Sequence, residues 1–213
     1  MRTRIKICGV SRPEDVKAAV EAGADAVGFV FHPASPRHVS IERAASLARA
    51  LPPFVTPVGL FVNAAPSVIA KACTAVPQLV LQFHGDEGAA ECAAPGRAFL
   101  KAARMAPGFD LLDFAGRFSG AQGLLLDAHV EAYGGSGKVF DWSLVPSGVS
   151  HRLVLSGGLH AGNVGSGIRA VRPWAVDVSS GVESSRGVKD AVAIQAFCDA
   201  VRTADARIDD APH

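Results

Sequence analysis

Short apolar runs alternate with longer amphipathic segments along the whole chain. The short runs are rich in Val, Leu, Ile and Phe and are nearly continuous, which is typical of parallel strands that are covered on both faces. Their alternation with amphipathic segments indicates repeated βαβ units. Eight such runs predict strands at residues 4–8, 26–31, 57–62, 79–83, 98–102, 123–127, 153–156 and 175–179.

The segments between these runs predict helices with recognisable ends. The first has Ser11 as a possible cap and Gly23 as its stop, and the second opens at Ser40 and ends before Pro52. Residues 204–213 contain three Asp, one Arg and one Pro without an apolar period, so we predict a frayed tail there. Further helices are predicted at residues 67–75, 111–117, 164–171 and 188–203, with a weak one at 87–96.

Eight βα units fit either a closed barrel or a doubly wound open sheet. The regular spacing, and the absence of a G-x-G-x-x-G motif after the first strand, favour the barrel. We therefore predict an α/β fold, a single-domain (β/α)₈ TIM barrel with parallel strands over residues 1–205, followed by a frayed tail at 206–213. In such barrels ligands bind where the strands end.

Composition narrows the possible partners. The chain has 21 Lys and Arg against 20 Asp and Glu, and it has no basic run, so neither nucleic acid nor a membrane surface is an expected partner. The apolar run after Arg2 is too short for a signal peptide or a membrane span. The four cysteines form no C-x-x-C pair, which argues against zinc and against disulfides. We expect a cytoplasmic protein with no metal and no cofactor.

Two successive strands end in glycine-containing loops. Gly157 and Gly158 follow the seventh predicted strand, and Ser180 and Gly181 follow the eighth. Glycines let the backbone approach a ligand and turn several N–H groups toward an anion. Such glycines are also ordinary turn residues, but loops at these two places in a barrel often bind phosphate. The pattern predicts a phosphate-binding site.

Two strand ends carry residues that can transfer protons. Asp127 follows three leucines, and a carboxyl group that is poorly hydrated suits general acid catalysis. The alternative is a helix cap or a partner for a basic residue. Cys8 ends the first strand, where it is either a small core residue or a reactive group. Nothing in the first strand alone decides between these two interpretations.

Other polar residues follow the same strand ends. Arg37 lies in a proline-stiffened loop and could bind a ligand carboxylate, and His84 could contact a ligand or pack structurally. The glycine-rich loop containing Gly135, Ser136 and Gly137 could hold an anion or move as a lid. Lys6 and Asp177 should both point into the barrel from adjacent strands, and we predict that they pair.

These residues together resemble the phosphoribosylanthranilate isomerase family over roughly residues 3 to 203. Relatives commonly have Thr where this chain has Ser136 and Leu where it has Phe83, and neither change affects the expected chemistry. The segments that carry the resemblance are Lys6-Ile7-Cys8-Gly9, Gly28-Phe29-Val30-Phe31, Ser35-Pro36-Arg37, Gly59-Leu60-Phe61-Val62-Asn63, Gln82-Phe83-His84-Gly85, Leu126-Asp127, Gly134-Gly135-Ser136-Gly137, Phe140-Asp141-Trp142, Ser156-Gly157-Gly158-Leu159 and Asp177-Val178-Ser179-Ser180-Gly181-Val182-Glu183.

The resemblance implies a metal-independent Amadori rearrangement in tryptophan biosynthesis, in which an aminoaldose phosphate becomes an aminoketose. It implies Asp127 as general acid and Cys8 as general base, with Arg37 on the anthranilate carboxylate and the last two loops on the phosphate. The expected partner is a small molecule that carries a phosphate and an anthranilate, and the chain is either a monomer or a homodimer. Alternatives are a related sugar-phosphate isomerase of histidine biosynthesis, a barrel that only binds a sugar phosphate, and a Cys8 nucleophile activated by His84.

Overall fold

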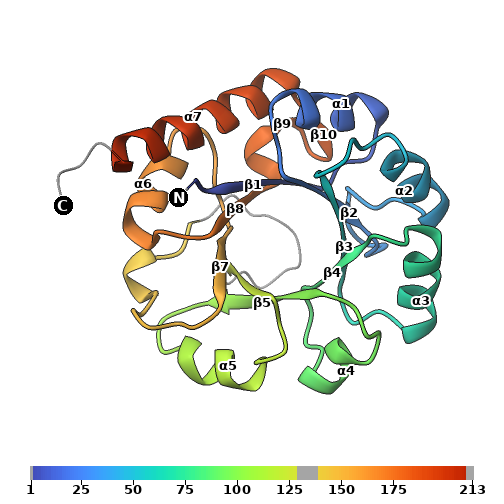
Figure 1. Cartoon of the computed structure of the whole chain (residues 1–213), viewed down its shortest axis with the longest axis horizontal. Helices are drawn as coiled ribbons and strands as arrows, with labels where there is room; N and C mark the ends of the chain where they lie inside the picture. The colour runs from blue at the N-terminus through green and yellow to red at the C-terminus, as the bar shows by residue number, and fades with distance from the viewer. Residues whose placement is uncertain (1, 129–138, 210–213) are drawn as a thin grey trace.

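A computed structural model describes residues 2–128 and 139–209. Eight parallel strands form a closed barrel in which each strand pairs with its neighbours in chain order, and β1 closes the barrel against β8 (Figure 1). The predicted TIM barrel is confirmed. The strands are β1 (Arg4–Cys8), β2 (Ala26–Val30), β3 (Thr56–Phe61), β4 (Val80–Phe83), β5 (Phe99–Met105), β6 (Gly123–Ala128), β7 (Arg152–Leu155) and β8 (Ala175–Val178).

Helices surround the barrel and lie between successive strands (Figure 1). In the described part of the β6–β7 connection, the helical element is the short 3₁₀ helix η1 (Trp142–Leu144). No helix within the described ranges is both long and apolar enough to cross a membrane. The α-helices are α1 (Pro13–Glu21), α2 (Ile41–Ala48), α3 (Pro66–Ala75), α4 (Ala89–Ala93), α5 (Leu111–Arg117), α6 (Val164–Val171) and α7 (Ala191–Asp209).

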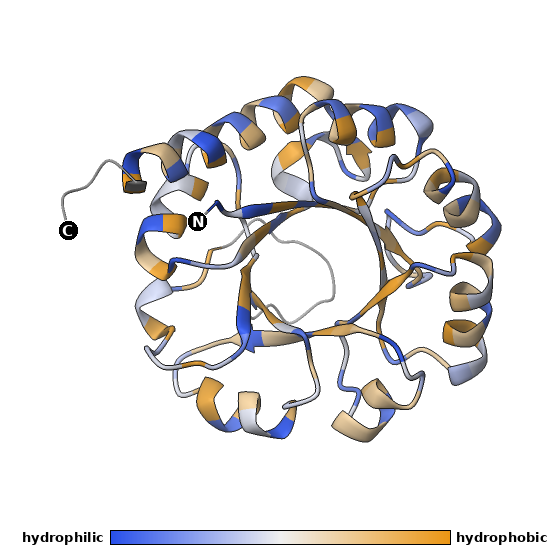
Figure 2. Ribbon diagram, in the orientation of Figure 1, coloured by the Kyte–Doolittle hydropathy of each residue, from blue (hydrophilic) through white to orange (hydrophobic). Residues whose placement is uncertain are grey.

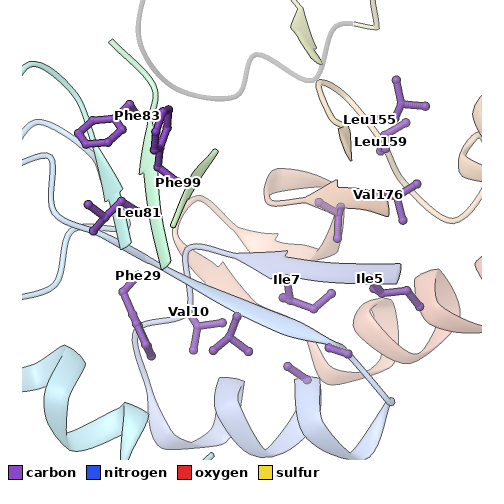
Figure 3. Close-up of a cluster of buried hydrophobic side chains, with 14 of the residues drawn as sticks. Ile5, Ile7, Val10, Phe29, Leu81, Phe83, Phe99, Leu155, Leu159 and Val176 are labelled. Carbon is purple, nitrogen blue, oxygen red and sulfur yellow. The ribbon is translucent and has the colours of Figure 1, made fainter. Parts of the chain in front are cut away.

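Strand alternation divides the side chains into two sets. Ile5, Ile7 and Phe29 point outward and are buried against the surrounding helices (Figure 3). The ribbon coloured by hydropathy shows apolar residues both on the strands and on the helices that cover them (Figure 2). The intervening positions of β1, including Lys6 and Cys8, point into the barrel, so the chemistry lies inside the ring and the main core lies outside it.

The end of the chain differs from the sequence prediction in two ways. Val188–Lys189 is not the start of a helix but forms strand β10, which pairs antiparallel with β9 (Glu183–Ser185) after the 3₁₀ helix η2 (Ser180–Val182). The predicted frayed tail is wrong as far as Asp209, because α7 continues to that residue. Ala204 is buried, and Asp205 accepts hydrogen bonds from the backbone N–H and the hydroxyl of Thr3, at 2.7 Å each. These contacts stabilise the last turns despite their polar sequence.

The predicted pair of charges inside the barrel is confirmed. Lys6 and Asp177 occupy matching positions on the adjacent strands β1 and β8. Lys6 Nζ donates a hydrogen bond to Asp177 Oδ1 at 2.7 Å, and both side chains are about 5% exposed. Ser156 Oγ, at the end of β7, donates to the other carboxylate oxygen at 3.2 Å. Three strands therefore share this buried ion pair.

Candidate active site

A cavity of about 110 Å³ lies at the carboxyl ends of the strands. It brings together most of the residues that the sequence singled out, from six different strand ends. Gly135, Ser136 and Gly137 lie outside the described residues. The predicted site residues that line the cavity are Cys8, Arg37, His84, Asp127, Gly157, Gly158 and Ser180.

Cys8 is buried at the inner end of β1, beside a glycine on β2. A Cβ placed on Gly28 would lie 2.8 Å from Cys8 Sγ and 3.2 Å from Lys6 Nζ, so only glycine leaves room for this thiol. Burial raises the pKa of the Cys8 thiol above its ordinary value, while the charge of Lys6 acts in the opposite direction. The structure therefore provides one cation that favours the thiolate form, inside an environment that favours the thiol.

The ammonium group of Lys6 remains charged in this environment. Burial acts to lower the pKa of Lys6, but the charges of Asp177 and Cys8 outweigh it and raise the pKa to about 12. Because Asp177 is itself held by Ser156, the cation has a fixed position near the thiol. Lys6 is thus a permanent positive charge next to Cys8.

Asp127 is the end of a chain of hydrogen-bonded side chains that starts on β4. His84 Nε2 lies 2.9 Å from Asp127 Oδ2, and His84 Nδ1 lies 2.9 Å from Gln82 Nε2. The backbone N–H of Ala128 donates to the second carboxylate oxygen, Oδ1, at 2.9 Å. Both oxygens of Asp127 are therefore oriented, and His84 contacts the carboxyl group directly.

Sequence reasoning named His84 but missed Gln82 as its partner. Gln82 is fully buried, and its amide nitrogen faces His84 Nδ1. His84 Nδ1 then accepts a hydrogen bond from this amide, which places the imidazole N–H on Nε2, toward Asp127. The alternation along β4 could have indicated this contact, because residues 82 and 84 share the inner face of the strand.

The first glycine loop packs directly on Asp127. Gly157 has φ 78° and Gly158 has φ 63°, backbone conformations that residues with a Cβ rarely adopt. A Cβ on Gly157 would lie 2.6 Å from the backbone nitrogen of Ala128 and 2.8 Å from Asp127 Oδ1. The loop therefore needs glycine both for its turn and for its close approach to the carboxylate.

The second loop packs against the first. A Cβ on Gly181 would lie only 1.9 Å from the carbonyl oxygen of Leu159, so the two loops meet without space for a side chain. Asn163 Nδ2 donates to the carbonyl oxygen of Gly158 at 3.0 Å and anchors the first loop at the start of α6. Gly181 thus shapes this rim through the backbone of Leu159, whereas Gly157, Gly158 and Ser180 line the cavity themselves.

Arg37 lines the cavity, but it also has a partner that sequence reasoning did not assign. Its Nε and Nη2 donate to the two carboxylate oxygens of Glu183, at 2.6 and 2.9 Å. Lys189 Nζ donates to Glu183 Oε1 at 2.7 Å. The β9–β10 pair that presents Glu183 and Lys189 was predicted in part as helix, so this contact was not foreseen.

Comparison with known proteins shows to which family the chain belongs. The family model described as "N-(5'phosphoribosyl)anthranilate (PRA) isomerase" matches residues 5–200. A curated N-(5'-phosphoribosyl)anthranilate isomerase of Methylibium petroleiphilum is 71% identical over 208 residues, which is 98% of this chain and 98% of that protein. The protein of the same name from Leptothrix cholodnii is 66% identical over 210 residues, covering 99% of this chain and 96% of the relative.

Solved structures agree with these sequence matches. The crystal structure of phosphoribosyl anthranilate isomerase from Thermotoga maritima superposes on this chain with a TM-score of 0.87 and 43% sequence identity. The match covers 94% of this chain and 99% of the T. maritima chain. A second isomerase was solved with reduced 1-(o-carboxyphenylamino)-1-deoxyribulose 5-phosphate, with a TM-score of 0.84, 40% identity and the same coverage. On sequence and fold together, this chain belongs to the N-(5'-phosphoribosyl)anthranilate isomerase family.

Proposed function

We propose that the chain catalyses the isomerisation of N-(5-phosphoribosyl)anthranilate in tryptophan biosynthesis. The reaction is a metal-independent Amadori rearrangement, an aldose–ketose isomerisation and thus an intramolecular oxidoreduction. The observation that carries the proposal is the single cavity lined by a thiol, a carboxyl group and two glycine loops, from Cys8, Asp127, Gly157 and Ser180. An acid and a base in one cavity are what proton movement along a sugar chain requires.

Ring opening is the task of Asp127. The carboxyl group, in its protonated form, gives its proton to the ring oxygen while the bond between C1 and that oxygen breaks. The lone pair of the anthranilate nitrogen forms the C=N bond of a protonated Schiff base. His84, which touches Asp127 Oδ2 at 2.9 Å, keeps the carboxyl group aimed into the cavity. Asp127 is left as a carboxylate.

Proton abstraction is the task of Cys8. Its thiolate takes the proton from C2, and the electron pair of that bond moves toward the positively charged nitrogen to give an enolamine. C1 then gains a proton and the 2-hydroxyl group loses one, which gives the ketone and restores both protein groups. C2 is oxidised and C1 is reduced, so no external oxidant or reductant takes part. Lys6 stabilises the thiolate by its charge.

The remaining residues bind the two ends of the substrate. Arg37 holds the anthranilate carboxylate through guanidinium N–H groups. The backbone around Gly157, Gly158, Ser180 and Gly181 holds the phosphate, because closely packed glycines expose N–H groups to an anion. Residues of both anchors line the same pocket as Cys8 and Asp127, so we expect the sugar carbons to lie near these two side chains.

The test follows the loss of the fluorescent aminoaldose in the wild type and in Cys8→Ala and Asp127→Ala. Each substitution should lower kcat by about 10²- to 10⁴-fold, the range typical of a removed general acid or base. Arg152→Gln, at the opposite end of the barrel, is the matched control and should keep wild-type turnover. Near-normal turnover in either alanine variant would refute the role of that residue. An inactive wild type would refute the function.

Metal independence has its own test. Turnover in the presence of a strong chelator should equal turnover without it, because the proposed steps use only side-chain acids and bases. A loss of activity that zinc or magnesium restores would show that the reaction needs a metal.

A further inference from the structure

Two loops at the rim of the barrel, β2–α2 and β8–α7, meet around the carboxylate of Glu183. Arg37 from the β2–α2 loop donates two hydrogen bonds, at 2.6 and 2.9 Å, one to each oxygen. Lys189 from β10 donates to Oε1 at 2.7 Å, and the backbone N–H of Gly187 donates to Oε2 at 3.1 Å. Four donors therefore fix one carboxylate, and through it they fix the guanidinium group of Arg37.

The cluster is buried and its charges do not cancel. The side chains of Arg37, Glu183 and Lys189 are 7%, 5% and 1% exposed. Burial acts to raise the pKa of Glu183, but the hydrogen bonds from Arg37 and Lys189 outweigh it and lower the pKa to about 2, so the carboxylate stays ionised. Burial lowers the pKa of Lys189, and Glu183 opposes that effect. Two cations and one anion give the three side chains a net charge of +1.

The cluster is also attached to the strand that carries Cys8. Lys189 Nζ donates to the carbonyl oxygen of Ser179 at 2.9 Å, and Ser179 Oγ donates to the carbonyl oxygen of Cys8 at 3.1 Å. On the other side, the Arg37 side chain fills the space beside Gly9, where a Cβ would lie 2.5 Å from Arg37 Cδ. Arg37 is therefore held from two directions while it lines the cavity.

We propose that Glu183 is a positioning residue for Arg37, and that the buried excess of positive charge, shared with Lys189, selects substrates with a carboxylate on the aromatic amine. This inference rests on the proposed function and deepens it. Glu183 takes two of the five guanidinium N–H groups, and the others are left to serve a ligand. A buried net positive charge is unfavourable unless an opposite charge neutralises it, and a substrate carboxylate supplies that charge.

One substitution separates positioning from simple charge attraction. Glu183→Gln raises the formal charge of the three side chains from +1 to +2, so attraction alone predicts tighter binding of a carboxylate. Positioning predicts weaker binding, because the amide N–H₂ of glutamine would face donors of Arg37, Lys189 or Gly187 and release the guanidinium group. The two explanations therefore differ in the sign of the effect.

The experiment compares two ligands and three variants. One ligand is the reduced aminoketose phosphate analogue, which carries the carboxyl group on its aromatic ring, and the other is the same analogue with an unsubstituted phenyl ring. Binding of each is measured by calorimetry. The variants are Glu183→Gln, Lys189→Met and the double variant. Steady-state kinetics with N-(5-phosphoribosyl)anthranilate and with N-(5-phosphoribosyl)aniline, which lacks the carboxylate, supply the matching KM and kcat values.

Glu183→Gln should weaken binding of the carboxylate analogue by about tenfold or more and raise KM for the anthranilate substrate, with a smaller change in kcat. Binding of the phenyl analogue should change less than about twofold, because that ligand does not use Arg37. Lys189→Met should weaken binding of the carboxylate analogue, because it removes one positive charge from the cluster. The double variant returns the formal charge to +1 and should still bind it weakly.

Tighter binding of the carboxylate analogue by Glu183→Gln would overturn the positioning role. Equal losses for both analogues would also overturn it, since they would indicate a general disruption of the rim. Circular dichroism and thermal unfolding show whether the variants fold. Calorimetry needs no turnover, so a wild-type protein that binds the carboxylate analogue selectively but does not convert the anthranilate substrate would refute the proposed function and leave the positioning role supported.

Discussion

The two ends of the barrel use charged residues in different ways. Toward the carboxyl end, Lys6 in the barrel interior and Arg37 at the rim are buried and paired with carboxylates. At the amino end, Arg4 and Arg152 lie 4.8 and 5.6 Å from the ring centroid of Trp174 and line a separate cavity of about 370 Å³. Buried hydrogen bonds to carboxylates hold Lys6 and Arg37, whereas Arg4 and Arg152 lie over an aromatic ring.

The difference shows how one set of strands separates stability from chemistry. Inside the barrel, Ala102, Leu125, Val154 and Ala175 form a small apolar cluster. Each strand extends from this cluster toward both ends of the barrel, and the glycines that permit close backbone contact with a ligand follow the carboxyl ends. We therefore expect substitutions toward the carboxyl end to change turnover or, where they break a buried ion pair, the free energy of unfolding. Substitutions at the amino end should change both only slightly.

The largest expected effect on stability is at Lys6. Lys6→Met leaves the buried carboxylate of Asp177 without its cation and should lower the free energy of unfolding by about 3–5 kcal/mol. Arg152→Gln, the control at the other end, removes an exposed contact with Trp174 and should lower it by about 1 kcal/mol or less. Urea unfolding measures both values.

A double variant sharpens this prediction. Lys6→Met with Asp177→Leu replaces the ion pair by apolar side chains and should recover most of the lost stability, because an uncharged pair has no desolvation cost. It should not recover turnover, since Cys8 has lost the adjacent cation. Equal stability of Lys6→Met and the wild type would contradict the difference between the two ends.

The next effect is on the pH dependence of turnover. Burial raises the pKa of Cys8 above its ordinary value of 9.0, so little thiolate exists at neutral pH. Cys8→Asp supplies a base that is already ionised, and both enzymes need the protonated form of Asp127. If the thiolate is the base, the ratio of kcat/KM of the wild type to that of Cys8→Asp should therefore rise by about tenfold per pH unit between pH 7 and 9. A ratio that stays constant over this range would argue against thiolate catalysis.

A smaller effect is expected in acid. The interactions of Glu183 lower its pKa from 4.5 to about 2. They therefore stabilise the folded protein fully above pH 4.5, and this contribution is lost as the pH falls toward about 2. The difference in free energy of unfolding between the wild type and Glu183→Gln should therefore shrink over this range. Unfolding by urea at several pH values measures it, and a constant difference would contradict the assigned pKa.

The smallest effect is expected at Phe54, beside the cavity of the amino end. Phe54 is 100% exposed and has φ 73°, a conformation that favours glycine. Phe54→Gly relieves this strain but adds conformational freedom to the unfolded chain. In a monomer, the free energy of unfolding should therefore change by about 1 kcal/mol or less. A related T. maritima isomerase is described as dimeric. A larger loss that depends on protein concentration would indicate a homodimer here.

The sequence predicted the barrel because its eight apolar runs share one pattern, and the rule that barrel ligands bind at strand ends then brought the main site residues together. Cys8, Asp127 and Arg37 were found in this way, and the structure places all three on one cavity. The Lys6 and Asp177 pair followed from alternation on adjacent strands. These inferences need only strand order and period.

The partners of the site residues were harder to predict. The contact of His84 with Asp127 joins two strands that are not adjacent, and the contact of Arg37 with Glu183 joins two loops. No local pattern fixes the distance between such elements. Lys189 was predicted as part of a helix over residues 188–203, although a short antiparallel pair forms there instead.

The pairing of Lys6 and Arg37 has a consequence for the order of synthesis. Their partners Asp177 and Glu183 lie 171 and 146 residues later in the chain. During translation the first quarter of the protein therefore leaves the ribosome with charged groups that cannot be buried. Because the final βα unit supplies every one of these partners, the active site and the closure of the barrel are completed in the same late event.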